Sequence, residues 1–210
     1  MVTEADARMI EYGSTIVLVT GGHITPLALD TLRERRITVV RDGAQSGADP
    51  EADQLAPSAQ VRTVAVAGDH TSLALKARLV QHLRGRGIAA HDLGTRTSDP
   101  VDYPDTAAAA ATQVMRGEAD AAVVIDGAGL GSTIAANKLA GIRAANCLTT
   151  TLARYARQHN GANVLALGST LVTADEAVAI LDTFIDTPMR EARYIRRLAK
   201  IRDLERRPRS

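Results

Sequence analysis

The stretch VVIDGAGLGSTIAANK, residues 123–138, joins a strand-like beginning to a glycine-rich turn and a helix-like end. Its apolar start ends in a carboxylate, Asp126, and glycines follow at Gly127, Gly129 and Gly131. The backbone N–H groups of such a turn, at a helix N-terminus, stabilise negative charge. A carboxylate at the start of an anion-binding turn is therefore the feature that needs an explanation.

The turn matches neither of two common nucleotide-binding motifs. A P-loop needs a Lys after its last glycine, but Ser132 follows Gly131. The dinucleotide motif needs a glycine three places after Gly129, and that place is again Ser132. The turn is therefore expected to suit an oxyanion that forms during a reaction at least as well as a resting phosphate.

Strand-like and helix-like segments alternate on both sides of this stretch. From Thr63 onward, five short apolar strands alternate with helices, a pattern typical of a parallel sheet covered on both faces. Residues 14–43 give a further strand, helix and strand, with Thr25 and Pro26 placed to begin the helix. The sequence predicts an α/β fold with a small N-terminal βαβ extension, which is either a separate unit or a continuation of the sheet.

Residues 44–60 lose all periodicity and contain glycine, two prolines and several acids, so we interpret them as a linker. The predicted domains are an N-terminal extension with its linker, residues 1–60, and a main domain, residues 61–210, that ends in a basic helix. Residues 190–210 hold eight Arg and one Lys against three acids, a local net charge of +6. Arg193 and Arg197 share a helix face there and could grip a phosphate.

Composition excludes several classes of protein. The net charge of +1 gives no general attraction to nucleic acid or membrane, and the aromatic fraction of 2% argues against a stacking platform for single-stranded nucleic acid. No apolar run is long enough to span a membrane, and the N-terminus lacks the apolar core of a signal peptide. The single cysteine, Cys147, allows no internal disulfide, and we expect it to be buried in the core of a cytoplasmic protein.

Polar side chains gather where the predicted strands end. Ligands of open parallel sheets bind beyond the carboxyl ends of the strands. We expect four polar clusters to converge on that edge: Asp69 with His70, Asp126 with the glycine turn, Ser169 with Thr170, and His159 with Asn160.

Several longer motifs resemble one known family. The segments AVAGDH, VDYPD, GAGLGSTIAANK, GIRA, ARQHNGANVLALGS and RYIRR, between about Thr63 and Ile201, are similar to motifs of the ribose-5-phosphate isomerase B family, which includes the galactose-6-phosphate isomerase subunits. The resemblance implies a three-layer α/β/α sandwich with a five-stranded, Rossmann-like parallel sheet. It also implies aldose–ketose isomerisation of a sugar phosphate through an enediolate, without metal or cofactor, in homodimers or tetramers whose sites are built from both subunits.

The same resemblance implies roles for individual residues. His159 would open the sugar ring with Asp69 nearby, while Asn160 would bind sugar hydroxyls and Tyr103 would line the pocket. His70, Arg193 and Arg197 would hold the phosphate. The amides of the turn from Gly127 to Gly131 would stabilise the enediolate, with Ser132 next to them in the substrate site.

This sequence departs from the family at the proton-transfer position. Members with a cysteine base carry it where Asp126 stands, and others use a Glu where Ser132 stands. Ala128 replaces a hydroxyl-bearing residue, and Thr170 replaces a phosphate-contacting Arg. Either Asp126 took over proton transfer, helped by partial burial that would raise its pKa, or the chemistry is changed or lost. The default substrates are ribose 5-phosphate and ribulose 5-phosphate; the alternatives are a tetrose phosphate, galactose 6-phosphate, or a non-catalytic sugar-phosphate-binding subunit.

The N-terminal extension lies outside this resemblance. Its segment GGHITPLALDTLRERRITVV is similar to a short element near the start of several bacterial microcompartment enzymes. That similarity implies a location inside a microcompartment, with shell proteins or pathway enzymes as partners. The alternative is an addition that widens a dimer interface or covers a sheet edge. Every candidate site residue lies after Thr63, so we expect residues 1–60 to be dispensable for the chemistry.

Overall fold

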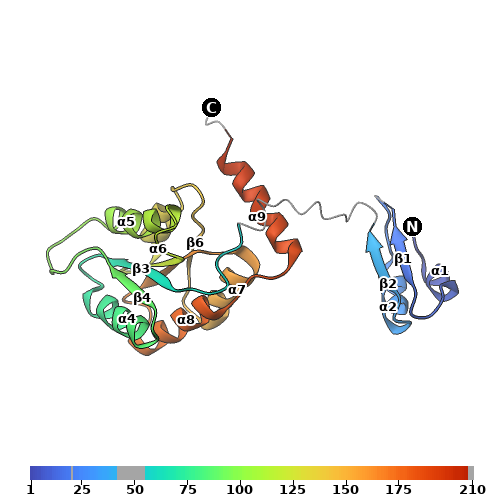
Figure 1. The fold of residues 1–210 in the computed structure, drawn as a ribbon, viewed down its shortest axis with the longest axis horizontal. Helices are drawn as coiled ribbons and strands as arrows, with labels where there is room; N and C mark the ends of the chain where they lie inside the picture. Colours follow the sequence, from blue (N-terminus) through green and yellow to red (C-terminus); the bar gives the residue numbers. More distant parts are fainter. Residues whose placement is uncertain (20, 42–54, 208–210) are drawn as a thin grey trace. The chain divides into compact units, whose positions relative to one another are not determined.

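The computed structural model describes residues 1–19, 21–41 and 55–207. The chain divides into two compact units, Met1–Asp49 and Pro50–Ser210, which are coloured blue and cyan to red in Figure 1. Residues 44–54 of the predicted linker lie outside the described residues. Each unit has its own sheet and its own core.

The larger unit is built on one fully parallel sheet. Its strands are β3 (Thr63–Gly68), β4 (Ala89–Asp92), β5 (Ala121–Asp126), β6 (Ala144–Asn146) and β7 (Val164–Gly168). They lie in the order β4-β3-β5-β7-β6. The register pairs Asp126 with Gly168 at the carboxyl ends of β5 and β7, and Ala122 with Val164 near their amino ends.

Helices cover both faces of this sheet. They are α4 (Leu73–Gly85), α5 (Tyr103–Met115), α6 (Leu130–Ala136), α7 (Thr150–Asn160), α8 (Ala174–Asp186) and α9 (Ala192–Glu205). Buried residues of α4, α7 and α8 pack on one face, and those of α5 and α6 pack on the other (Figure 1). The predicted three-layer α/β/α fold with five parallel strands is therefore confirmed.

Successive side chains of each strand point to opposite faces of the sheet, so the two faces differ in the size of their residues. Large side chains point to α4, α7 and α8: Val64, Val66, Val123, Ile125, Leu165 and Leu167. Mostly small ones point to α5 and α6: Ala65, Ala67, Ala122, Val124 and Ala166. The alanine-rich α5 packs on this second face because small side chains on both sides allow close approach. Cys147 is 1% exposed and belongs to the core, as predicted, and burial raises the pKa of its thiol to about 11.

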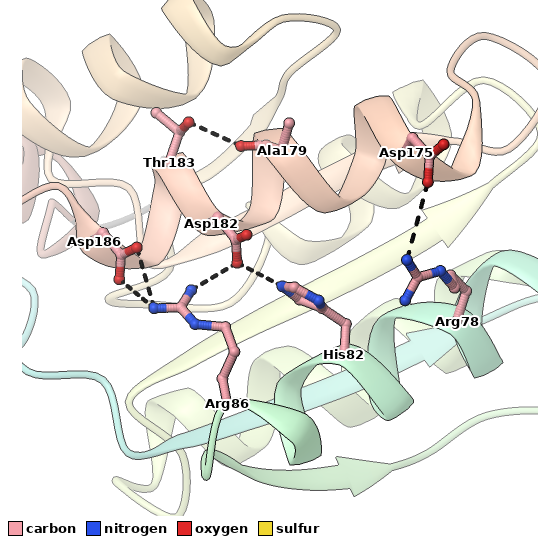
Figure 2. A network of polar contacts seen from close by, with 8 residues as sticks. All are labelled: Arg78, His82, Arg86, Asp175, Ala179, Asp182, Thr183 and Asp186. Atoms are coloured by element: carbon pink, nitrogen blue, oxygen red, sulfur yellow. Dashed lines mark hydrogen bonds and ion pairs between the residues drawn. The ribbon is translucent and has the colours of Figure 1, made fainter.

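Charged side chains join α4 to α8 at the surface of the first face (Figure 2). Asp182 accepts hydrogen bonds from Arg86 Nη1 at 2.6 Å and contacts His82 Nε2 at 2.7 Å. Arg86 Nη2 also donates to Asp186 at 2.8 Å. This network holds the two helices against each other. Its residues are distant in sequence from the glycine turn.

The smaller unit contains α1 (Glu4–Met9), β1 (Thr15–Leu18), α2 (Pro26–Glu34) and β2 (Thr38–Arg41). β1 and β2 form a two-stranded parallel sheet of their own, so the extension does not continue the larger sheet. Its core consists of Ala7, Ala28, Leu32 and Ile37. The sequence reading missed α1, although Thr3 and Asp6 form a capping box at its start.

No helix in the described part of the chain is long and apolar enough to cross a membrane.

Candidate active site

Polar side chains at the carboxyl ends of β3, β5 and β7 lie together, and we name them the strand-end cluster: Asp69, His70, Asp126, Ser169 and Thr170. The N–H of Asp69 donates to the carbonyl of Ile125 at 3.1 Å, and that of Ser169 to the carbonyl of Asp126 at 2.8 Å. Thr170 Oγ1 donates to the carbonyl of Gly127 at 2.6 Å. Three of the four predicted polar clusters therefore meet at one edge of the sheet.

Asp69 is buried at the end of β3 and is connected to Ser169 of the cluster through Thr71. Its Oδ1 accepts from the N–H of Thr71 at 2.9 Å and from Thr71 Oγ1 at 2.6 Å. Thr71 Oγ1 also lies 3.3 Å from Ser169 Oγ. His70 accepts the N–H of Val101 on Nδ1 at 3.3 Å, which leaves Nε2 as its remaining polar atom.

The Asp126 carboxylate is 6% exposed and organises the glycine turn that follows it. Its Oδ1 accepts from the N–H groups of Ala128, at 2.8 Å, and of Gly129. Its Oδ2 accepts from the N–H of Ser132 at 2.7 Å, in the first turn of α6. The prediction that all amides from Gly127 to Gly131 face the substrate is therefore wrong for Ala128 and Gly129, because Asp126 already binds them.

The pKa of the Asp126 carboxyl lies below its usual value, so the predicted upward shift is wrong. Burial raises this pKa, but the Ser132 hydroxyl and the amides of Ser132, Gly129 and Ala128 together lower it by more, because they stabilise the charged form. The three amides donate directly to the carboxylate, whereas the buried Ser132 Oγ makes no hydrogen bond within the described residues. Asp126 is thus a weaker base than predicted, but ionised over a wider pH range.

Two glycines of the turn are required by close neighbours. Gly129 has a φ of 76°, and a Cβ there would lie 2.8 Å from Asn146 Oδ1. A Cβ on Gly131 would lie 2.6 Å from the ring of Tyr103, which begins α5 and is 42% exposed. Tyr103 therefore lies against the turn, where the resemblance places a pocket-lining residue.

A second group of predicted site residues surrounds His159, and we name it the α7–α9 cluster: Tyr155, His159, Arg193, Tyr194 and Arg197. His159 stacks between Tyr155 and Tyr194, with ring centroids 4.8 and 4.6 Å away. Arg193 donates to the hydroxyl of Tyr194 at 2.8 Å, and the Arg197 guanidinium lies 5.5 Å from the same ring. Asn160 ends α7 beside this cluster and is exposed.

The two clusters lie at opposite ends of the strands: the strand-end cluster at the carboxyl ends, and the α7–α9 cluster at the amino end of β7. Helix α7 returns from the end of β6 to the amino end of β7, so His159 precedes that strand, whereas Asp126 pairs with Gly168 at its far end. The five residues of β7 span roughly 15 Å at about 3.3 Å per residue. The prediction that all four polar clusters converge within one chain is therefore wrong, because a crossover helix leads back to the start of the sheet.

Sequence reasoning missed several residues that support these clusters. Thr71 links Asp69 to Ser169, and Asn146 Nδ2 donates to the carbonyl of Ala128 at 3.0 Å. Tyr194 was not singled out, although its place one residue after Arg193 could have indicated a role. Within residues 1–19, 21–41 and 55–207, no three His, Cys, Asp or Glu side chains are grouped to hold a metal ion.

Comparisons with known proteins give the family. The model of the ribose/galactose isomerase family matches residues 64–201. Ribose-5-phosphate isomerase B of Escherichia coli K12 is 40% identical over 147 residues, which are 70% of this chain and 99% of that protein. The chain belongs to the ribose/galactose isomerase family.

Solved structures agree with this assignment. Ribose-5-phosphate isomerase B of Clostridium thermocellum is 41% identical, with a TM-score of 0.67 over 68% of this chain and 97% of that one. The Mycoplasma genitalium enzyme with bound ribulose 5-phosphate is 36% identical, with a TM-score of 0.67 over 70% and 97%. The predicted family and the predicted class of activity, aldose–ketose isomerisation of a sugar phosphate, are confirmed.

Proposed function

We propose that this chain interconverts ribose 5-phosphate and ribulose 5-phosphate, and that Asp126 moves the proton between the two sugar carbons. The observation that carries the proposal is the placement of two buried carboxylates, Asp69 and Asp126, at the ends of adjacent strands beside the glycine turn. The relative from Mycoplasma genitalium, solved with ribulose 5-phosphate, supports the choice of substrate.

Asp126 has the acceptor capacity that this role requires. A carboxylate offers about four lone-pair positions, and the amides of Ala128, Gly129 and Ser132 use three of them. Oδ1 is filled by two donors, whereas Oδ2 accepts one and keeps a position for a substrate proton. A carboxylate is a competent base for a carbon acid next to a carbonyl.

The enediolate oxygen needs donors that Asp126 does not use. Leu130 and Gly131 begin α6, and their N–H groups have no acceptor within the helix itself. These two amides would stabilise the oxyanion, which appears only after the proton has left the sugar. The Ser132 hydroxyl would be a further donor, whereas Thr170, whose hydroxyl proton is bound to the carbonyl of Gly127, would bind the substrate as an acceptor.

The α7–α9 cluster would act on the substrate bound to a second copy of the chain. His159 would open the sugar ring, Asn160 would bind sugar hydroxyls, and Arg193 and Arg197 would hold the phosphate with His70. The distance between the two clusters within one chain supports this arrangement. We therefore propose a homodimer, alone or paired into a tetramer, with each site built from both copies.

The remaining proposals concern the extension. We propose that the N-terminal extension is a part distinct from the isomerase domain, with a boundary near Asp49 instead of residue 60, and that it directs the enzyme to a bacterial microcompartment. The brief sequence similarity of residues 21–40 supports this location. Co-purification of the full chain with shell proteins, and its loss on removal of residues 1–41, would test it.

A coupled isomerase assay tests the main proposal. The purified chain should act on ribose 5-phosphate with a higher kcat/KM than on a tetrose phosphate or galactose 6-phosphate. A preference for one of the other sugars would overturn the substrate assignment, and no turnover of any of them would overturn the enzymatic one.

The second candidate function is that of a sugar-phosphate-binding subunit without catalysis. It is favoured by the lowered pKa of Asp126 and by the amides that this side chain binds. Tight binding of ribose 5-phosphate by calorimetry, together with no turnover, would identify this case.

A further inference from the structure

The last residues of the predicted linker are bound to the larger unit by two arginines, the half-buried Arg143 and the fully buried Arg157. Arg143 Nη2 donates to the carbonyl of Leu55 at 2.8 Å. Arg157 Nη2 donates to the carbonyl of Ser58 at 3.0 Å. Residues 55–58, which we name the anchor segment, therefore have defined partners although their sequence shows no periodicity.

Arg157 shows how closely the anchor segment is held. Its side chain is fully buried, with its guanidinium 5.0 Å from the centre of the Phe184 ring. Burial, with repulsion from Arg143, lowers its pKa to about 10 despite the opposing effect of Asp120. A second donor, Nη1, binds the carbonyl of Ala162 at 2.9 Å. Loss of the Ser58 carbonyl would leave a buried charged donor without an acceptor, which is costly.

Arg143, the residue before β6, makes the same kind of contact. Its Nε donates to the carbonyl of Gly161 at 2.7 Å, in the turn that follows His159 and Asn160. The two arginines thus join the anchor segment to the turn between α7 and β7. That turn directly follows the proposed ring-opening and hydroxyl-binding residues, His159 and Asn160, which end α7.

The anchor segment also contacts the helix that carries the proposed phosphate ligands. Leu55 and Ala56 pack against a small apolar cluster formed by Met189, Tyr194 and Leu198. Tyr194 stacks on His159, accepts the hydrogen bond of Arg193 and lies under Arg197. Tyr194 thus joins the apolar cluster on which Leu55 packs to three functional groups, His159, Arg193 and Arg197.

We infer that the anchor segment positions α9, and that Leu55 is a positioning residue for the phosphate-binding arginines. The inference rests on the proposed function of Arg193 and Arg197. It corrects the expectation that all of residues 1–60 are dispensable, because residues 55–58 lie before the family match at 64–201 and still support the site.

The test uses three variants of the full chain. Leu55→Ala removes the contact with α9, Leu55→Met restores an apolar side chain of similar volume, and Val61→Ala is the matched control. Val61 is a partly buried apolar residue that packs on the main core of the sheet instead of the cluster at α9. Each variant is compared with the parent for KM, for kcat, and for amide hydrogen exchange in residues 192–205 by mass spectrometry.

Leu55→Ala should raise KM for ribose 5-phosphate by about three- to tenfold with a smaller change in kcat, because ground-state binding of the phosphate is weakened. Exchange in residues 192–205 should accelerate, and Leu55→Met should restore both values. Val61→Ala should lower the unfolding temperature without changing either. Unchanged exchange in α9 of Leu55→Ala, or an equal KM effect of Val61→Ala, would overturn the inference. If the parent shows no turnover and Leu55→Ala still accelerates exchange in residues 192–205, the positioning is supported and only the proposed function is refuted.

Discussion

The strand-end cluster and the α7–α9 cluster are held in place by different forces. Backbone groups fix the first: three amides of the glycine turn and the start of α6 bind Asp126, and carbonyls at the strand ends bind Asp69 and Ser169. Aromatic stacking and long, exposed side chains form the second, with His159 between two tyrosines. The first is therefore preorganised by the sheet, while the second depends on how α9 is supported. Since they lie at opposite ends of the strands, the proposed site needs one cluster from each of two chains.

The largest effect is expected when the two clusters are inactivated in separate chains. Asp126→Asn and His159→Ala should each lower kcat by at least about a hundredfold, the usual contribution of an acid–base group. Co-refolding equal amounts of the two variants should restore about a quarter of the parent activity, because half of the dimers are mixed and one of their two sites is intact. A mixture as inactive as its components would show that both clusters serve the same chain.

The next effect concerns the arginines of α9. Arg193→Ala and Arg197→Ala should each raise KM by about tenfold to a hundredfold, since a hydrogen bond to a charged group contributes about 1.5–3 kcal/mol. Inhibition by inorganic phosphate should weaken in parallel. Arg196→Ala is the matched control, because Arg196 is an exposed arginine on the same helix. An equal effect of all three changes would show a general influence of charge instead of a defined phosphate site.

The structural role of Asp126 predicts a pH dependence of stability. Its folded pKa is lower than the ordinary value of 3.8, so its contribution is present above that value and is lost as the pH falls through the folded pKa. Asp126→Asn should lower the free energy of unfolding by about 1–3 kcal/mol at pH 7. Denaturant titrations should show this difference shrinking below about pH 4. A difference that stays constant down to pH 2 would contradict the assigned cause.

The smallest effect is expected in the network between α4 and α8. Arg86→Ala should reduce stability by about 0.5–1 kcal/mol, because its ion pairs with Asp182 and Asp186 are partly exposed to solvent. Arg78→Ala should have no measurable effect, since Arg78 and Asp175 are 3.9 Å apart and exposed (Figure 2). Neither change should alter KM. A change in KM in Arg86→Ala would show that the contact between α4 and α8 influences the proposed active site.

The fold was predictable from local patterns. Apolar runs such as residues 63–68 and 121–126 gave the strands, and Thr25 with Pro26 gave the start of α2. The motifs of residues 127–138 and 156–169 identified the family, which the comparisons confirm. The helix α1 was missed because it has only six residues, too few to show periodicity.

The site was only partly predictable, because its properties depend on contacts between distant segments. The pKa of Asp126 follows from three amides whose direction is set by the path of the turn. The place of His159 follows from the return of α7 to the amino end of β7, which the motif does not show. Residues 55–58 carry no motif at all, and their partners Arg143 and Arg157 lie about 90 to 100 positions later.

Solvent-deuterium incorporation tests the central claim, proton transfer by Asp126, most directly. The parent chain, incubated with ribose 5-phosphate in D2O, should place deuterium on the carbon next to the carbonyl, as detected by NMR. Asp126→Asn keeps the shape of the side chain and removes the base, so its exchange should fall to the rate without enzyme while ribose 5-phosphate still binds. Exchange by Asp126→Asn at the rate of the parent would contradict the assignment of the base, and the absence of exchange in the parent would contradict catalysis itself.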